Sequence, residues 1–212
     1  DGDADRCIAV DENGNVVDGD AMLYILGLRL KNRGMLNKNT VVATVMSNSG
    51  FFASLKRAGM EVDQTAVGDR FVYESMLKND FSLGGEQSGH IIFGRLANSG
   101  DGLLTAIKVM EVICESKMSL SELAAGMTMY PQVLKNVIVT DKDETLNCPL
   151  VKEAVKKAEE EMGSDGRVVL RKSGTEPLLR VMVEATTLAI CEEKTEAIID
   201  AMRQAGMLIR VK

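Results

Sequence analysis

The chain has 212 residues, of which 26% are charged and 45% are hydrophobic, a composition that excludes disordered and collagen-like chains. The formal net charge of −6 disfavours a broad basic face for nucleic acid but leaves room for a local basic pocket. No stretch approaches the ~20 consecutive apolar residues of a membrane helix, so we expect neither a nucleic-acid nor a membrane partner.

Strand and helix patterns alternate through the first 130 residues. Residues 7–10 and 16–17 predict a hairpin, because Asn13-Gly14 between them favours a tight turn. Further strands are predicted over 40–46, 61–66 and 91–93, and helices over 21–33, 51–58, 70–78, 103–116 and 121–125. We expect Asp20 and Asp101 to cap the first and fourth of these helices, and Gly34 to end the first. This alternation is typical of a layered α/β unit with a mixed sheet.

A smaller α+β unit of about 80 residues is predicted after a boundary near residues 128–134. Its strands are expected over 133–140, 168–171 and 179–185, and its helices over 150–162 and 192–204. The polar run 141–147 is expected to be a connection.

The chain starts at Asp1, with neither an initiator Met nor a signal peptide, and we therefore expect it to be part of a longer protein. Its four cysteines lack paired spacing, which predicts reduced thiols and a cytoplasmic location. These are Cys7, Cys114, Cys148 and Cys191. The single histidine, His90, excludes a metal site built from several histidines.

An acidic cluster opens the chain, with Asp1, Asp3 and Asp5 at alternate positions before Arg6. Carboxylates in this pattern suit a hard cation such as Mg²⁺ or Ca²⁺. An EF-hand loop is one alternative, because Ile8 and Glu12 also fall at its positions, but Arg6 stands where that loop needs Gly and no helix enters it. An acidic turn without an ion is a second alternative.

A second polar cluster occupies residues 84–90, where glycines flank Glu86, Gln87, Ser88 and His90. Donors and acceptors at this density suit sugar hydroxyls, which need both. A polar turn that only joins two elements is equally compatible with the composition. The segment Gly68-Asp69-Arg70 also allows two interpretations: it contacts a ligand, or it caps the helix that follows.

A basic cluster follows at residues 171–177, with one more arginine in the next strand. Guanidinium groups, hydroxyls and an exposed backbone N–H together favour a phosphate site over an ordinary solvated turn. The candidate residues are Arg171, Lys172, Ser173, Gly174, Thr175 and Arg180.

The motifs DGDADR, GEQSGHIIF and RKSGTEP, in this order and at roughly this spacing, resemble the α-D-phosphohexomutase superfamily over essentially the whole chain. Gln87 is typical of the branch that acts on glucosamine phosphates, whereas phosphomannomutase and phosphoglucomutase relatives usually carry Met there. The resemblance implies four domains around a cleft. Residues 1–19 would be the tail of domain 2 with its metal loop, 20–131 domain 3, and 132–212 domain 4.

The activity implied by the resemblance is the interconversion of glucosamine 6-phosphate and glucosamine 1-phosphate through a phosphoserine and a bisphosphate intermediate. The catalytic phosphoserine of the family lies in a Thr-x-Ser-His-Asn-Pro-type loop, which this sequence does not contain. We therefore expect the chain alone to be inactive, with the N-terminal domains as its missing partner. The resemblance also allows a homodimeric parent.

Roles for individual residues follow from the matched motifs. Mg²⁺ would be held by Asp1, Asp3 and Asp5, with Arg6 close by, and the sugar by Glu86 and Ser88. The phosphate that is not transferred would be bound by Arg171, Ser173, Gly174 and Thr175, with Arg180 beside them. Lys172 stands where relatives often have Pro, and neither it nor His90 is given a role. Three alternatives stay open: a phosphomannomutase/phosphoglucomutase, a non-catalytic phosphosugar-binding module and a Ca²⁺-binding signalling protein.

Overall fold

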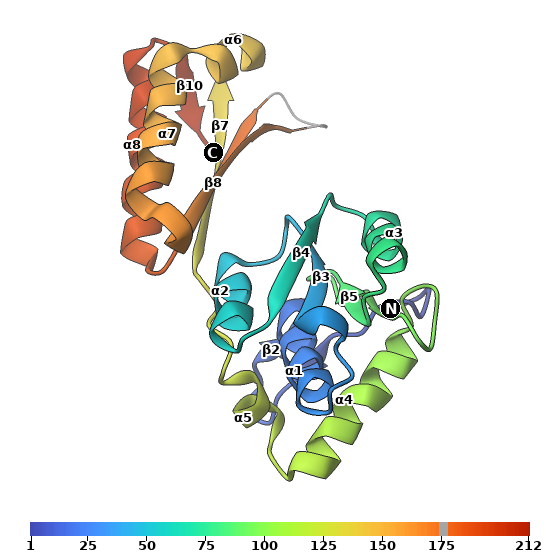
Figure 1. The fold of residues 1–212 in the computed structure, drawn as a ribbon. Coiled ribbons are helices and arrows are strands. Elements are labelled where there is room, and N and C mark those ends of the chain that lie inside the picture. The colour runs from blue at the N-terminus through green and yellow to red at the C-terminus, as the bar shows by residue number, and fades with distance from the viewer. Residues whose placement is uncertain (174–177) are drawn as a thin grey trace. The chain divides into compact units, whose positions relative to one another are not determined.

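The computed structural model describes residues 1–173 and 178–212 and divides the chain into two compact units, Asp1–Met129 and Tyr130–Lys212 (Figure 1). Each unit has a hydrophobic core of its own. The first is a layered α/β unit with a mixed sheet, and the second is a smaller α+β unit, which confirms the predicted fold class.

The first unit is built around a four-stranded sheet in the order β4-β3-β5-β6. Its strands are β3 (Thr40–Thr44), β4 (Glu61–Thr65), β5 (Leu83–Gly85) and β6 (Ile91–Phe93). Strand β3 runs parallel to β4 and β5, and β6 is antiparallel to β5. A separate antiparallel hairpin joins β1 (Ala9–Val10) to β2 (Val16–Val17), as predicted. The helices are α1 (Gly19–Asn32), α2 (Ser49–Arg57), α3 (Asp69–Asn79), α4 (Gly102–Ser116) and α5 (Leu120–Ala124), with a 3₁₀ turn over Asn37–Asn39.

Strand β3 is buried on both faces, which explains its unbroken run of small and apolar side chains. Val42 packs with Val72 and Met76 of α3 on one face of the sheet. Val41 and Ala43 point to the other face, where they join the core that α1 and α2 complete.

Two sequence predictions in this unit were wrong. Helix α1 is capped by Asp18 rather than Asp20, because the Asp18 carboxylate accepts the Ala21 N–H at 3.1 Å. Asp20 is instead fully buried and accepts the Asn48 N–H at 2.8 Å. Strand β5 was missed because its glycines were interpreted as a turn. The sheet needs glycine there, since a Cβ on Gly84 would lie 2.7 Å from the Met76 sulfur.

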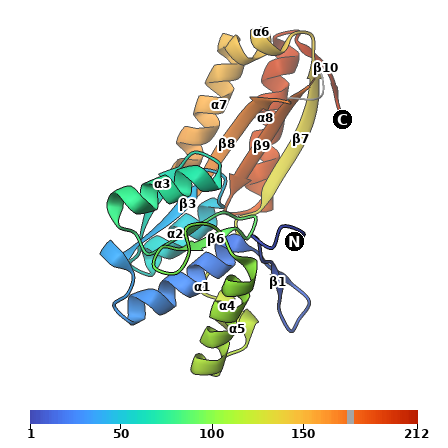
Figure 2. The same ribbon diagram turned by 90° about the vertical axis from the view of Figure 1, so that its right-hand side faces the viewer.

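The second unit has an antiparallel sheet in the order β10-β7-β9-β8. Its strands are β7 (Gln132–Val139), β8 (Gly166–Lys172), β9 (Leu179–Ala185) and β10 (Leu208–Val211). Helices α7 (Pro149–Met162) and α8 (Leu188–Gln204) lie side by side along one face of this sheet (Figure 2). The short helix α6 (Lys142–Asn147) and a 3₁₀ turn over Gly163–Asp165 complete the unit.

The sequence missed two elements of this unit. The expected connection over 141–147 contains α6, because the Asp141 carboxylate accepts the N–H groups of Asp143 and Glu144 and so caps a short helix. Strand β10 was not predicted, since its four residues are held by the distant strand β7. Within the described ranges, no helix combines the length and hydropathy that crossing a bilayer requires.

Candidate functional site

The acidic loop, residues 1–6, packs against two other polar segments of the first unit. The Cys7 N–H donates to the Gly89 carbonyl at 3.1 Å, and the Gly102 N–H donates to the Ala4 carbonyl at 2.9 Å. Arg6 also forms an isolated antiparallel bridge with His90. The loop between β5 and β6 (residues 86–90, the 86–90 loop) and the start of α4 therefore hold the acidic loop in place.

Glycines permit this close approach of backbones. A Cβ on Gly89, whose φ is +88°, would lie 2.0 Å from the Cys7 carbonyl oxygen. A Cβ on Gly102 would lie 2.4 Å from the Arg6 carbonyl oxygen, and one on Gly19 would lie 2.0 Å from that of Glu86. No side chain fits at these distances, so glycine is required at all three contacts.

The 86–90 loop is tied to the N-terminal ends of two helices. At α1, the Gly19 N–H donates to the Gln87 carbonyl at 3.0 Å, and the Gln87 side-chain amide donates to the Asp18 carboxylate at 3.3 Å. At α3, the Gly68 N–H donates to one oxygen of the Glu86 carboxylate at 3.0 Å. Glu86 is half-buried in this position, and Ser88 is exposed.

His90 is buried, with an exposed fraction of 4%, and connects three segments. Its Nε2 accepts the Gly100 N–H at 3.2 Å. The same atom lies 3.7 Å from an Asp5 oxygen and 3.9 Å from an Asp69 oxygen. Carboxylates of the acidic loop and of the Gly68–Arg70 segment are therefore gathered beside the 86–90 loop.

The predicted metal ligands share the acidic loop but do not converge on one point. Within the described ranges, no group of three His, Cys, Asp or Glu side chains is arranged to hold an ion. Asp1 lies 3.9 Å from the Arg6 guanidinium, and Asp3 is exposed. Asp5 Oδ1 is buried and has no hydrogen-bond partner among the described residues. Three hard carboxylates, one with an unsatisfied buried oxygen, fit the ligand chemistry of Mg²⁺.

The EF-hand alternative disagrees with the structure around Glu12. An EF-hand would use this carboxylate as a bidentate ligand, but here it accepts hydrogen bonds from the backbone and hydroxyl of Ser121. Hydrogen bonds from the Ser119 and Ser121 hydroxyls lower the pKa of Glu12 to about 2. Glu12 thus fastens the β1–β2 hairpin to the start of α5.

A row of polar residues crosses the sheet of the second unit. Arg171 on β8 lies directly opposite Arg180 on β9, and Arg180 lies opposite Asn136 on β7. Directly opposed residues share a face, and the buried neighbours Leu179 and Val181 occupy the face that packs on α7 and α8. The arginines therefore project from the other face, side by side. Arg180 Nε is buried without a hydrogen-bond partner in the described part of the chain, and Arg171 is exposed.

The rest of the basic cluster is described only in part. Ser173 is buried, and its N–H donates to the Leu178 carbonyl at 3.0 Å across the end of the hairpin. Lys172 forms an ion pair with Asp143 of α6. The predicted phosphate ligands Gly174 and Thr175 lie outside the described residues.

Two neighbours of the candidate residues were not singled out by the sequence. Asn136 joins the arginine row through strand register, for which the sequence carries no local signal. Asp18 holds Gln87 as well as capping α1, and its contact with a residue 69 positions away carries no local signal in the sequence. Asp69 was considered only as part of the segment Gly68-Asp69-Arg70, which could either contact a ligand or cap α3.

Comparison with known sequences identifies the family to which this fold belongs. Residues 18–130 match the phosphoglucomutase/phosphomannomutase alpha/beta/alpha domain III, and residues 134–201 match the phosphoglucomutase/phosphomannomutase C-terminal domain. The chain belongs to the phosphoglucomutase/phosphomannomutase family.

Similar curated proteins carry the name phosphoglucosamine mutase. One from Shouchella clausii is 52% identical over 204 residues, which are 96% of this chain and 46% of that protein. One from Leuconostoc mesenteroides is 53% identical over 208 residues, which are 98% of this chain and 46% of that protein. The chain thus spans about half the length of the curated relatives it matches.

Solved structures share the fold at low sequence identity. Aspergillus fumigatus N-acetylphosphoglucosamine mutase superposes with a TM-score of 0.75 at 20% identity, over 97% of this chain and 47% of that one. A structure of the same enzyme in complex with GlcNAc-6P and magnesium gives a TM-score of 0.72 at 20% identity, over 95% of this chain and 51% of that one.

Proposed function

We propose that this chain supplies the sugar-binding and phosphate-binding part of a phosphoglucosamine mutase, which interconverts glucosamine 6-phosphate and glucosamine 1-phosphate. The observation that carries the proposal is the arginine row, in which Arg171 and Arg180 lie directly opposite each other on one face of the sheet. Two like charges in this position repel each other, and a phosphate dianion relieves the repulsion by accepting hydrogen bonds from both. The relatives named phosphoglucosamine mutase, at 50–53% identity, support the choice of substrate.

The phosphate that is not transferred would be gripped by Arg171, Arg180 and the hydroxyl of Ser173, with Gly174 and Thr175 as further proposed donors. Guanidinium groups offer paired N–H donors to a phosphate whichever carbon bears it. This suits a reaction in which a bisphosphate intermediate reorients and presents either of its two ends.

The sugar ring would be held by the Glu86 carboxylate and by the exposed Ser88. Their positions are fixed through the backbone bonds from the 86–90 loop to α1 and through the Gly68 contact. A carboxylate and a hydroxyl together accept from and donate to vicinal sugar hydroxyls. A loop attached to helix ends places these groups more precisely than a free turn would.

The acidic loop is proposed to hold Mg²⁺ through Asp1, Asp3 and Asp5, with Arg6 beside the ion. When bound, the ion would neutralise negative charge on the transferring phosphoryl group. In this proposal residues 1–19 belong to a preceding domain, residues 20–131 form the sugar-binding domain and residues 132–212 form the phosphate-binding domain. We place the protein in the cytoplasm, which the four free thiols support.

Calorimetric titration of the 212-residue chain with glucosamine 6-phosphate and mannose 6-phosphate tests the proposal. We expect saturable binding that favours the amino sugar and is at least tenfold weaker in an Arg171→Ala variant. Arg203→Ala is the matched control, because Arg203 is an exposed arginine of α8 in the same unit, paired with Asp200.

Turnover separates the binding role from catalysis. The chain should bind without converting the sugar phosphate, because the sequence has no loop of the family's phosphoserine type. Equal binding in Arg171→Ala and Arg203→Ala would contradict the phosphate assignment. Turnover by the pure 212-residue chain would contradict the proposal that this chain binds the substrate while another part of the enzyme carries the catalytic serine.

A further inference from the structure

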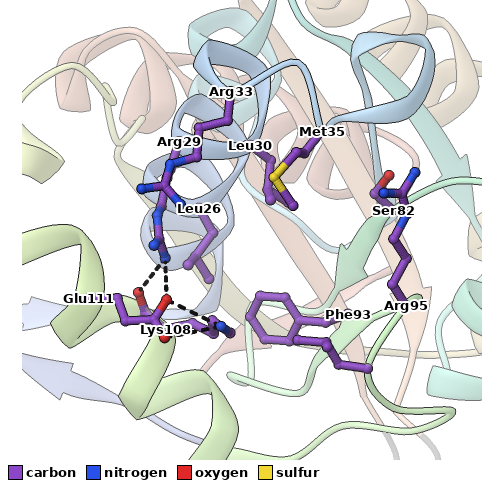
Figure 3. Close-up of a pocket in the computed structure, with 11 residues that line it drawn as sticks. Leu26, Arg29, Leu30, Arg33, Met35, Ser82, Phe93, Arg95, Lys108 and Glu111 are labelled. Atoms are coloured by element: carbon purple, nitrogen blue, oxygen red, sulfur yellow. Dashed lines mark hydrogen bonds and ion pairs between the residues drawn. The ribbon is translucent and has the colours of Figure 1, made fainter. Parts of the chain in front are cut away.

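A cavity of about 240 Å³ opens on the first unit between α1, α4 and the end of β6, away from the 86–90 loop. Its wall includes Leu26 and Leu30 of α1, Met35 and Phe93 (Figure 3). Leu26 and Phe93 belong to the core, so the floor is rigid, whereas Met35 is 41% exposed at the mouth. The volume exceeds the roughly 150 Å³ of an engineered protein cavity that binds benzene.

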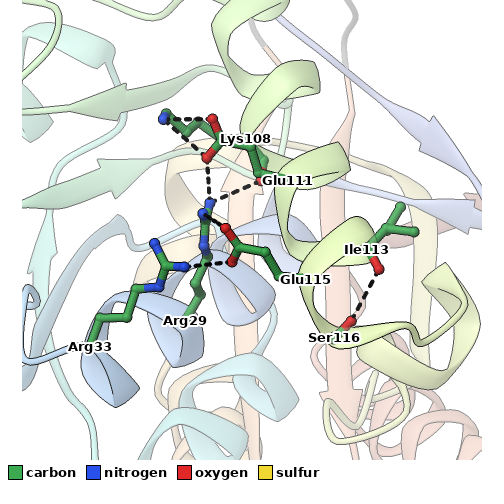
Figure 4. Close-up of polar contacts among 7 residues, drawn as sticks. All are labelled: Arg29, Arg33, Lys108, Glu111, Ile113, Glu115 and Ser116. Carbon is green, nitrogen blue, oxygen red and sulfur yellow. Dashed lines mark hydrogen bonds and ion pairs between the residues drawn. The ribbon is translucent and has the colours of Figure 1, made fainter.

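Basic side chains surround this apolar floor, and three of them share two carboxylates (Figure 4). Glu111 pairs with Arg29 at 2.8 Å and with Lys108 at 3.1 Å. Glu115 pairs with Arg29 at 2.8 Å and with Arg33 at 2.7 Å. One of the three positive charges is therefore left uncompensated in this network.

Arg95 adds a second uncompensated charge. Among the residues that the structure describes, no carboxylate lies within ion-pair distance of its guanidinium, which donates only a long hydrogen bond of 3.4 Å to the Asn37 side chain. In Figure 3 the ring of Phe93 lies between Arg95 and Lys108. Four basic side chains at the cavity thus face two carboxylates, a formal excess of two positive charges around an apolar floor.

We propose that this cavity is a second ligand site, which binds a phosphate monoester carrying one aromatic ring. The ring packs between Phe93 and Leu30, where it replaces water on apolar surface. The phosphate lies at the rim and accepts from Arg95, whose guanidinium has donors to spare. The dianionic charge of a phosphate monoester matches the excess of two positive charges, which favours it over a neutral ring or a carboxylate.

Phenyl phosphate is the probe, titrated into the ¹⁵N-labelled 212-residue chain and followed by amide chemical shifts. Phenol carries the ring without the charge, and inorganic phosphate carries the charge without the ring. We expect phenyl phosphate to shift amides of α1, α4 and β6 saturably, and each control compound to bind at least tenfold more weakly. Arg95→Gln should weaken phenyl phosphate at least tenfold. Arg70→Gln, at an exposed arginine paired with Glu74 outside the cavity, should leave its binding unchanged.

Three outcomes would overturn the proposal. Equal affinity of Arg95→Gln and Arg70→Gln for phenyl phosphate would show that Arg95 does not contact the phosphate. Phenol binding as tightly as phenyl phosphate would show that the cavity recognises only the apolar ring. Shifts confined to β8 and β9 would place the ligand on the arginine row instead. The last result would leave the proposed mutase function intact, because that function depends on the row and not on this cavity.

Discussion

Gly19→Ala tests whether the 86–90 loop is held by the close approach of α1. The added methyl would lie 2.0 Å from the Glu86 carbonyl oxygen and 2.7 Å from the Gly89 nitrogen, so the loop must move away. The move breaks the 3.0 Å bond from the Gly19 N–H to the Gln87 carbonyl and strains the contact from Cys7 to Gly89. At about 1 kcal/mol for each of two backbone bonds, the free energy of unfolding of the first unit should fall by about 2 kcal/mol.

Thermal unfolding followed by circular dichroism measures the effect. A loss of about 2 kcal/mol lowers the midpoint by roughly 6–12 °C for a unit of this size. Gly2→Ala is the control, because a Cβ on Gly2 would meet nothing within 4 Å. It should leave the midpoint within about 2 °C, as expected of a surface change. A Gly19→Ala variant with both the wild-type midpoint and wild-type affinity for glucosamine 6-phosphate would refute the reasoning.

Two further substitutions test contacts around the same unit. Glu12→Gln should remove a stabilisation that depends on pH. Because folding lowers the pKa of Glu12 from 4.5 to about 2, the ionised carboxylate stabilises the fold fully at pH values above 4.5. This stabilisation is lost as the pH falls toward 2. The difference in midpoint between wild type and Glu12→Gln should therefore be largest above pH 5 and shrink toward pH 2, and a constant difference would contradict the assignment. Gln87→Met removes the bond to Asp18 and should weaken glucosamine 6-phosphate about fivefold by calorimetry, the equivalent of about 1 kcal/mol. An unchanged affinity would mean that Gln87 does not position the loop.

Elements with strong local patterns were predicted well from the sequence. Strand β3 was found because burial on both faces demands an unbroken apolar run, and α4 because Asp101 stands directly before it and accepts the Leu104 N–H. Choosing between Asp18 and Asp20 as the cap of α1 was beyond local sequence. The deciding partner of Asp20 is the N–H of Asn48, 28 residues away.

Elements that depend on distant partners escaped prediction. The glycines of β5 resemble turn residues until Met76 is packed against them, and β10 is a strand only because β7 accepts it. The same limit applies to the candidate site. The motifs identified Arg171 and Arg180, but only strand register shows that they face each other and that Asn136 continues the row.

The arginine row also shows how the phosphate assignment relates to stability. Guanidinium groups directly opposite each other on neighbouring strands destabilise a free sheet by roughly 0.2–1 kcal/mol. Nothing in the core requires this pairing, because Leu179 and Val181 provide the packing on the opposite face. Lys172, the next residue along β8, lies opposite Leu179 on the other face of the sheet and pairs there with Asp143, so this carboxylate does not reach the row. An arrangement that weakens the empty fold is consistent with the proposed phosphate site, since the two charges that repel each other in the free chain would both become hydrogen-bond donors to one phosphate dianion.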